Sequence, residues 1–220
     1  MGSRQVGSRQ VGSRQVGGSG VVWGIEFINP FITLFKMKKQ LLVIICLVLV
    51  SVGVQAQKVV NLSKSPMDKA YYPVNFAHDR KGADKAVVSV TYCRPAKNGR
   101  EVFGKLVPFG KVWRTGANES TEIKFFQDVT IQGKTVKAGN YSLFSIPGEK
   151  EWTIILSSDV NFWGAFKYNE AHDVLRTTVP AKKVESVFEN MTIEFVNGMD
   201  KEAILQIVWD TTLVELPIAF

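Results

Sequence analysis

The stretch GKVWRTGANESTEI at 110–123 places a large aromatic, a guanidinium, an amide and a carboxylate close together around a small Thr-Gly-Ala step. A guanidinium is a planar fork that pairs with carboxylates, and an Asn tolerates turn dihedrals. Arg114 therefore suits an anionic ligand, with Asn118 and Glu119 holding hydroxyls. The same types also suit a buried Arg114–Glu119 clamp that closes a loop onto a sheet, which is the interpretation we favour.

Aromatic side chains form the second candidate group. Trp113 is adjacent to Arg114, so in a strand the two side chains would face opposite sides and Trp113 would face the core. The stretch NFWGAF at 161–166 is predicted to be a loop or short helix, where Trp163 could stack on a sugar ring. Aromatic residues are also heavily used in sandwich cores, and a core or loop-fastening role is favoured here.

Other catalytic and metal-binding chemistry has little support in the sequence. His172 and His78 are the only histidines, whereas a metal site or acid–base pair at His172 needs more such groups brought close. Cys93 is the one cysteine after residue 56, and it follows a strand-like run that predicts a packed thiol. The sequence holds no glycine-rich phosphate loop, nucleophile elbow or paired-cysteine motif. We therefore expect no metal and no cofactor.

The first 56 residues read as material outside the mature protein. GSRQV recurs with a period of five at 2–16, which is too short and too polar to build a core. Met37, two lysines, the apolar run 41–50 and small residues before Gln57 predict a bacterial signal peptide at 37–56. Residues 1–36 are then translated upstream sequence. The apolar run is shorter than the roughly 20 residues that span a bilayer, so no membrane span is expected after cleavage. The predicted location is periplasmic or secreted.

The predicted mature chain is nearly neutral. Residues 1–56 hold six basic residues and one acidic residue of the 27 and 20 in the whole chain, which leaves 21 basic against 19 acidic. No dense run of Lys and Arg remains, and nucleic-acid binding is therefore not expected.

Strand signals dominate from residue 86 onward. Turn residues separate short β-branched or alternating runs at 86–92, 121–126, 129–136 (a hairpin around Gln132 and Gly133), 139–147, 151–157, 174–179, 191–196, 203–209 and 213–218. Only 100–106 and 162–173 have the pattern of a short helix. We predict an all-β fold, a single antiparallel β-sandwich or barrel-like domain at 86–220 with at most one or two short helices. An irregular lead-in at 57–85, carrying an edge strand, precedes it.

Long blocks of the chain resemble a known secreted bacterial family, the domain of unknown function 2911. The resemblance spans 65–195 and is carried by SVTYCRPAKNGREVFGKLVPFGKVWRTGANESTEIKF, VTIQGKTVKAGNYSLFSIPGEKEWTIILS and WGAFKYNEAHDVLR. Within them, the family signature is matched by Arg94 with Pro95, Gly99 with Arg100, 110–119, Ala138 with Gly139, and Trp163 with Gly164. The resemblance implies an all-β envelope or secreted protein without an assigned activity.

Two functional hypotheses follow. The first is a non-catalytic binding or structural envelope module whose ligand is a glycan or a small anion. The second is a hydrolase-type enzyme, or other enzyme, built around Arg94, Arg100, Arg114, Asn118 and Glu119, since a carboxylate beside a positioned Arg can do acid–base work. A cleft holding Arg114 and Glu119 beside Trp163 would favour a ligand site, whereas a direct pair would favour the clamp. The oligomeric state stays open.

Overall fold

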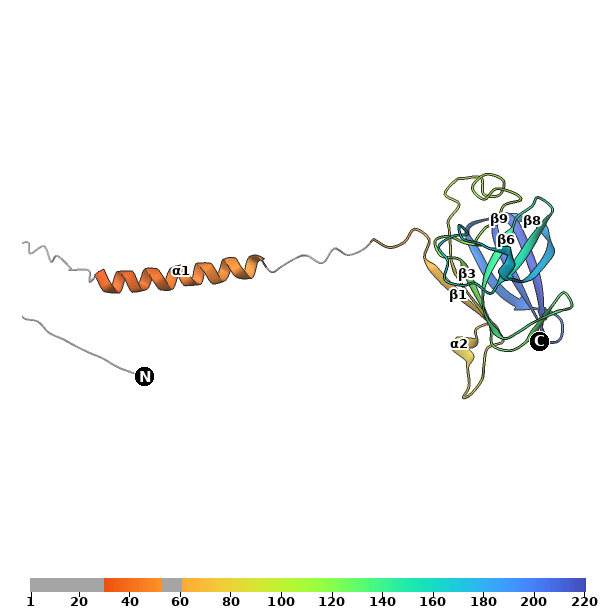
Figure 1. The fold of residues 1–220 in the computed structure, drawn as a ribbon, viewed down its shortest axis with the longest axis horizontal. Helices are drawn as coiled ribbons and strands as arrows, with labels where there is room; N and C mark the ends of the chain where they lie inside the picture. Colours follow the sequence, from red (N-terminus) through yellow and green to blue (C-terminus); the bar gives the residue numbers. More distant parts are fainter. Residues whose placement is uncertain (1–29, 53–60) are drawn as a thin grey trace, which may run out of the picture. The chain divides into compact units, whose positions relative to one another are not determined.

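The N-terminal segment contains one helix. The computed structural model describes residues 30–52 and 61–220, and helix α1 (Pro30–Val52) contains the apolar run 41–50 (Figure 1). Within the described ranges, no helix combines the length and apolar character needed to cross a membrane. The GSRQV repeats and the expected cleavage site at Gln57 lie outside the described residues, so the signal peptide stays a prediction.

Residues 61–220 contain a single nine-stranded antiparallel sheet. Its spatial order is β1-β2-β3-β6-β7-β8-β9-β4-β5, an open arrangement with β1 and β5 at its edges. The strands are β1 (Met67–Tyr72), β2 (Val88–Cys93), β3 (Thr121–Phe125), β4 (Val129–Ile131), β5 (Lys134–Val136), β6 (Gly139–Ile146), β7 (Glu151–Ser157), β8 (Asp173–Asn197) and β9 (Glu202–Ala219). The prediction of an all-β antiparallel fold is confirmed, and the sheet is not a closed barrel.

The two longest strands bend the sheet over its own core (Figure 1). The start of β8 pairs with β7, and its later part pairs with β9 across register shifts near Phe188. Asp210 breaks the regularity of β9 with a φ of 54°, and its carboxylate binds Lys97 Nζ at 2.6 Å. Beyond the bend, Met191 N–H donates to Pro95 O at 2.9 Å, so β8 returns to the end of β2. The second part of β8 thereby covers the core from the opposite side.

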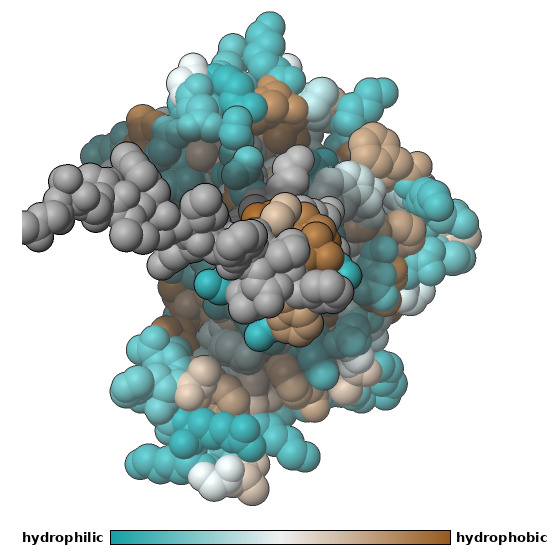
Figure 2. Space-filling view, turned by 90° about the vertical axis from the view of Figure 1, so that its left-hand side faces the viewer, coloured by the Kyte–Doolittle hydropathy of each residue, from teal (hydrophilic) through white to brown (hydrophobic). Residues whose placement is uncertain are grey.

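Alternating burial along the strands follows from the sequence pattern. In β3, Thr121, Ile123 and Phe125 are buried while the residues between them are more exposed. The core contains an aromatic cluster of Phe103, Trp113, Trp152 and Trp209, whose ring centroids lie 4.9–6.2 Å apart. On the face that Figure 2 shows, hydrophilic residues predominate at the top and bottom, with hydrophobic residues in patches between them.

The structure differs from the sequence prediction in how the elements are joined. The runs 174–179 and 191–196 are parts of one strand, β8, and the runs 203–209 and 213–218 are parts of β9. The expected edge strand of the lead-in is β1. Helical turns in 61–220 are limited to α2 (Phe76–Asp79) and the 3₁₀ helix η1 (Glu170–His172). The segment 100–106 forms no helix.

The β4–β5 hairpin gives a stability prediction. Gln132 and Gly133 have φ of 46° and 77°, which is the positive-φ pair of a tight two-residue turn. A Cβ on Gly133 would meet no atom within 4 Å, so the cost of a substitution comes from the backbone alone. Gly133→Val should lower the free energy of unfolding by about 1–2 kcal/mol in urea titrations. Gly133→Asn, which tolerates this conformation better, should cost less. Equal stability of wild type and Gly133→Val would contradict this account.

Candidate functional site

Trp113 fastens the loop between β2 and β3 to the core. Its backbone pairs with Ser145 of β6 through N–H to O contacts of 2.7 and 2.9 Å. Its indole joins the aromatic cluster, and Nε1 donates to Gly116 O at 3.1 Å. Trp113 is buried, as its position next to Arg114 predicts, and it presents no face to a ligand.

The small residues after Arg114 are required by close packing. Thr115 is fully buried, with a φ of 54°, and its hydroxyl donates to Ser145 Oγ at 2.9 Å. A Cβ on Gly116 would lie 3.1 Å from both Cys93 O and Thr121 Oγ1. Thr121 Oγ1 in turn donates to Thr115 O at 2.7 Å. The turn is therefore held against β2 and β6 by hydrogen bonds of the backbone and of short hydroxyl side chains.

The favoured Arg114–Glu119 clamp is wrong. Both residues lie in the described part of the chain, and no ion pair joins them. Arg114 is partly buried, its Nε has no hydrogen-bond partner, and burial lowers the pKa of its guanidinium. Glu119 is exposed and accepts a hydrogen bond from the Cys93 thiol at 3.4 Å. Because Thr115 and Gly116 are fixed to neighbouring strands, the loop does not fold back to bring the two charges together.

Asn118 holds two segments against the loop. Its side-chain Nδ2 donates to Ser63 Oγ at 3.2 Å and to Ser65 O at 3.4 Å. Its backbone carbonyl accepts from Gly164 N–H at 2.9 Å. Asn118 thereby connects the lead-in segment and the aromatic loop 158–169 to the turn, and these contacts occupy its amide.

The loop 158–169 is paired with the turn through main-chain contacts. Ser120 N–H donates to Phe162 O at 2.9 Å, and Glu119 forms an antiparallel bridge with Trp163. Phe162 turns inward, with its ring 6.1 Å from that of Phe144 on the outer face of β6. Trp163 turns outward and is 64% exposed. Phe162 therefore fits the loop-fastening role expected for this stretch, and Trp163 lies at the surface.

A groove of about 330 Å³ lies beneath Trp163, over the outer face of β1, β2 and β3. This size falls in the range of small-ligand sites. Its walls include Met67, Cys93, Glu119, Glu122, Asn161 and Trp163. Of the seven residues proposed from sequence, the groove brings together Glu119 and Trp163. The outward position of Glu122 could have been predicted from strand alternation once Ile123 is assigned to the core. No sequence pattern indicated that Met67 or Asn161 would line the groove.

The groove contains two carboxylates and a protonated thiol. Glu119 and Glu122 form no ion pair with any described residue. Burial, assisted by the hydrogen bond to Glu119, raises the pKa of the Cys93 thiol. The thiol is therefore protonated at neutral pH and lacks the thiolate form that acts as a nucleophile. The lining offers carboxylate and amide oxygens as acceptors beside one exposed aromatic face.

The other two arginines are engaged elsewhere. Arg94 Nη2 lies 2.7 Å from Asp68 Oδ2 and donates to the Tyr92 hydroxyl at 3.1 Å. Arg100 Nε and Nη2 donate to the carbonyls of Lys97 and Ala96 at 2.9 and 2.7 Å. Neither arginine lines the groove, so the constellation required by the hydrolase hypothesis is not assembled there.

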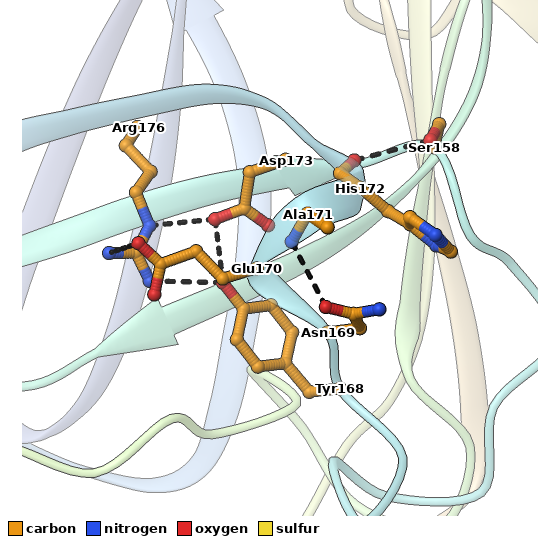
Figure 3. A network of polar contacts seen from close by, with 8 residues as sticks. All are labelled: Ser158, Tyr168, Asn169, Glu170, Ala171, His172, Asp173 and Arg176. Carbon is orange, nitrogen blue, oxygen red and sulfur yellow. Dashed lines mark hydrogen bonds and ion pairs between the residues drawn. The ribbon is translucent and has the colours of Figure 1, made fainter.

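A polar network anchors the loop that carries Trp163 (Figure 3). The Tyr168 hydroxyl donates to Asp173 Oδ2 at 2.6 Å, and Arg176 donates to the same carboxylate at 2.7 Å and to Tyr168 Oη at 2.9 Å. The His172 ring points away from this cluster toward Asp159, its partner. Within 30–52 and 61–220, no group of three or more His, Cys, Asp or Glu side chains is arranged to hold a metal ion.

The network predicts a pH dependence. Burial, together with the hydrogen bond to Asp173, raises the pKa of Tyr168 to about 12 from its ordinary 10.0. Because the pKa of Tyr168 is higher in the folded state than in the unfolded state, the neutral phenol contributes fully to the free energy of unfolding below pH 10. This contribution is lost as the pH approaches 12. In urea titrations, the free energy of unfolding of wild type should fall more steeply across this window than that of Tyr168→Phe. The control Phe166→Leu, which changes an exposed aromatic of the same loop without a titrating group, should keep the wild-type slope. Identical slopes for Tyr168→Phe and wild type would refute the assignment.

A double-mutant cycle tests the absence of the clamp. Arg114→Met keeps the apolar stem and removes a partly buried guanidinium, so stability should be unchanged or higher. The coupling energy between Arg114→Met and Glu119→Gln should stay below about 0.5 kcal/mol. A buried pair would instead cost about 3–5 kcal/mol when broken. The matched control Arg94→Met loses the contact with Asp68 and should destabilise more than Arg114→Met.

Comparison with known proteins assigns the chain to one family. The family model described as "Protein of unknown function (DUF2911)" matches residues 75–218, well over half of the chain. Neither the curated proteins nor the solved structures contain a match to the chain. The matched range contains Cys93, Glu119, Glu122 and Trp163, and it bears out the resemblance seen in the sequence. The chain belongs to the DUF2911 family.

Proposed function

We propose that this protein is an exported, non-catalytic binding module that holds a saccharide in the groove beneath Trp163. The observation that carries the proposal is the exposed indole of Trp163, bridged through its backbone to Glu119 in a groove whose mainly apolar lining includes two carboxylates. An aromatic ring packs against the apolar face of a sugar, and carboxylate or amide oxygens accept hydrogen bonds from its hydroxyls. Export is supported by the signal-peptide pattern at 37–56.

The charges of the groove favour one of the two ligand classes considered from the sequence, a glycan or a small anion. Glu119 and Glu122 both line it, and the arginines that suggested an anionic ligand do not. A bound anion would lie beside two carboxylates without a cation, which is electrostatically unfavourable. A neutral or basic sugar avoids this repulsion, and its hydroxyls can donate to the two carboxylates, so it is the better occupant.

A binding role is supported over catalysis by the groups in the groove. The Cys93 thiol is kept protonated, and its proton is directed to Glu119. Arg94 and Arg100 are bound to other partners, and the Arg114 side chain does not line the groove. The groove thus offers contacts to hydroxyls and one stacking surface.

Intrinsic fluorescence gives a direct test. The tryptophans of the core cluster are buried and should resist quenching by acrylamide. Subtracting the fluorescence of Trp163→Phe from that of wild type isolates the signal of Trp163, which acrylamide should quench. Titration with neutral soluble oligosaccharides (chitooligosaccharides and cello-oligosaccharides) should protect Trp163 from quenching for at least one of them. Trp163→Ala lacks this fluorescent probe, and by calorimetric titration it should bind the same oligosaccharide about tenfold more weakly or worse, which corresponds to about 1.4 kcal/mol.

The control is Phe166→Ala. Phe166 is an exposed aromatic of the same loop that does not line the groove, so its loss should leave the affinity near that of wild type. Glu122→Gln, which keeps an acceptor oxygen, should reduce affinity less than Glu122→Ala. If no oligosaccharide protects Trp163, or if Trp163→Ala binds as well as wild type, the saccharide proposal fails.

A further inference from the structure

Two sulfur atoms belong to the wall of the groove beneath Trp163, and they differ in exposure. Met67 and Cys93 are opposite one another in the β1–β2 ladder, and both residues line the groove. Cys93 is 4% exposed, whereas Met67 is 60% exposed. Among the lining residues, Met67 and Trp163 are the exposed apolar side chains. A ligand that stacks on the indole therefore also covers the thioether of Met67.

The start of β1 is fixed on both sides of Met67. Pro66 O accepts a hydrogen bond from Arg94 N–H at 2.8 Å, and Asp68 Oδ2 lies 2.7 Å from Arg94 Nη2. These contacts join the residues before and after Met67 to the end of β2. The side chain of Met67 is thereby kept at the groove, and what it presents to a ligand depends on the oxidation state of its sulfur.

Exposure decides which sulfur reacts with a peroxide. A thiol reacts through its thiolate, and burial raises the pKa of the Cys93 thiol, so Cys93 is a poor target. A thioether has no proton to lose and needs only access to solvent. Within 61–220, Met191 is fully buried, whereas Met67 and Met199 are 60% and 78% exposed. Met199 belongs to the β8–β9 connection and does not line the groove, so Met67 is the oxidisable sulfur there.

We propose that Met67 is a site of oxidation by hydrogen peroxide, and that its sulfoxide weakens ligand binding in the groove beneath Trp163. A sulfur lone pair attacks one oxygen of the peroxide, the O–O bond breaks, and an S–O bond forms while the other oxygen leaves as water. The sulfur is oxidised by two electrons, and the peroxide is reduced by two. This regulation rests on the saccharide-binding role proposed above.

The sulfoxide turns an apolar contact into a hydrated one. Its oxygen binds water, and a sugar that lies over Trp163 and Met67 must displace that water, which lowers affinity. The oxygen is also an acceptor, so it competes with the carboxylates of Glu119 and Glu122 for the same sugar hydroxyls. The affinity of the oxidised groove should therefore be about three- to tenfold lower than that of the reduced one.

Peptide mass spectrometry after graded treatment of the full-length chain with hydrogen peroxide tests the site itself. Met67 and Met199 should be oxidised at rates within about threefold of each other, because both are exposed. Met191 should be oxidised at least about tenfold more slowly in the folded chain, and in urea the three rates should converge. Oxidation of Met67 as slow as that of Met191 would overturn the proposal.

Calorimetric titration with the oligosaccharide that protects Trp163 tests the consequence. Peroxide-treated wild type should bind about three- to tenfold more weakly, and methionine sulfoxide reductases with a dithiol should restore the affinity. Treated Met67→Leu should keep its untreated affinity, which also separates Met67 from Met37, an exposed methionine of α1. Treated Met199→Leu should lose affinity as wild type does. Met67→Gln, polar and of similar length, should bind weakly without any peroxide.

The two proposals fail in different ways. If untreated wild type binds no oligosaccharide, the saccharide role fails, and the oxidation rate of Met67 still decides whether the groove is a site of oxidation. If untreated wild type binds and treated wild type binds equally well, the regulation is overturned while the saccharide role stands. A loss of affinity in treated Met67→Leu as large as that in wild type would overturn the regulation as well.

Discussion

The packing of Phe103 and Trp113 against Trp152 and Trp209 is the interaction on which the rest of the fold depends. The first two rings belong to the long connection between β2 and β3, and the other two belong to β7 and β9. Trp113 stacks on Trp209 with an interplanar angle of 19°, and this contact joins the connection to β9. Without this contact, a connection of nearly thirty residues would have few apolar anchors to offset the entropy of ordering it.

The groove beneath Trp163 is a consequence of where that connection is anchored. Trp113 fixes the start of the turn, and the turn carries Glu119 to the loop of Trp163, so the groove is formed by two non-regular segments on a rigid sheet. Sites of this kind, on loops positioned by a scaffold, are common because loops change without loss of the core.

The sequence was informative wherever local pattern decides structure. Alternation predicted β3, β6 and β7, and the Gln132–Gly133 pair predicted a hairpin, since these depend on neighbouring residues. The sequence pattern predicts two strands where the structure has β8, because the charged segment after Pro180 resembles a loop. In the structure, pairing with β9 across register shifts keeps that segment extended. Arg114 and Glu119 have suitable spacing for a pair, but contacts of Gly116 with β2 prevent it. Such long-range contacts leave no local signature, and for the same reason Met67 and Asn161 could not be assigned to the groove.

The order of the strands in the sheet also bears on how the chain reaches its folded form. β6 and β7 are neighbours in sequence and can pair early, and so are β8 and β9, but Ala219 of β9 also pairs with the distant Thr130 of β4. Pairings between distant segments slow folding, because the entropy of closing a long loop is lost before the contact forms. Until β9 joins, Phe103 and Trp113 lack the ring of Trp209. A partly folded chain therefore exposes aromatic surface, and its partition between folding and self-association is set by how quickly the last strand docks.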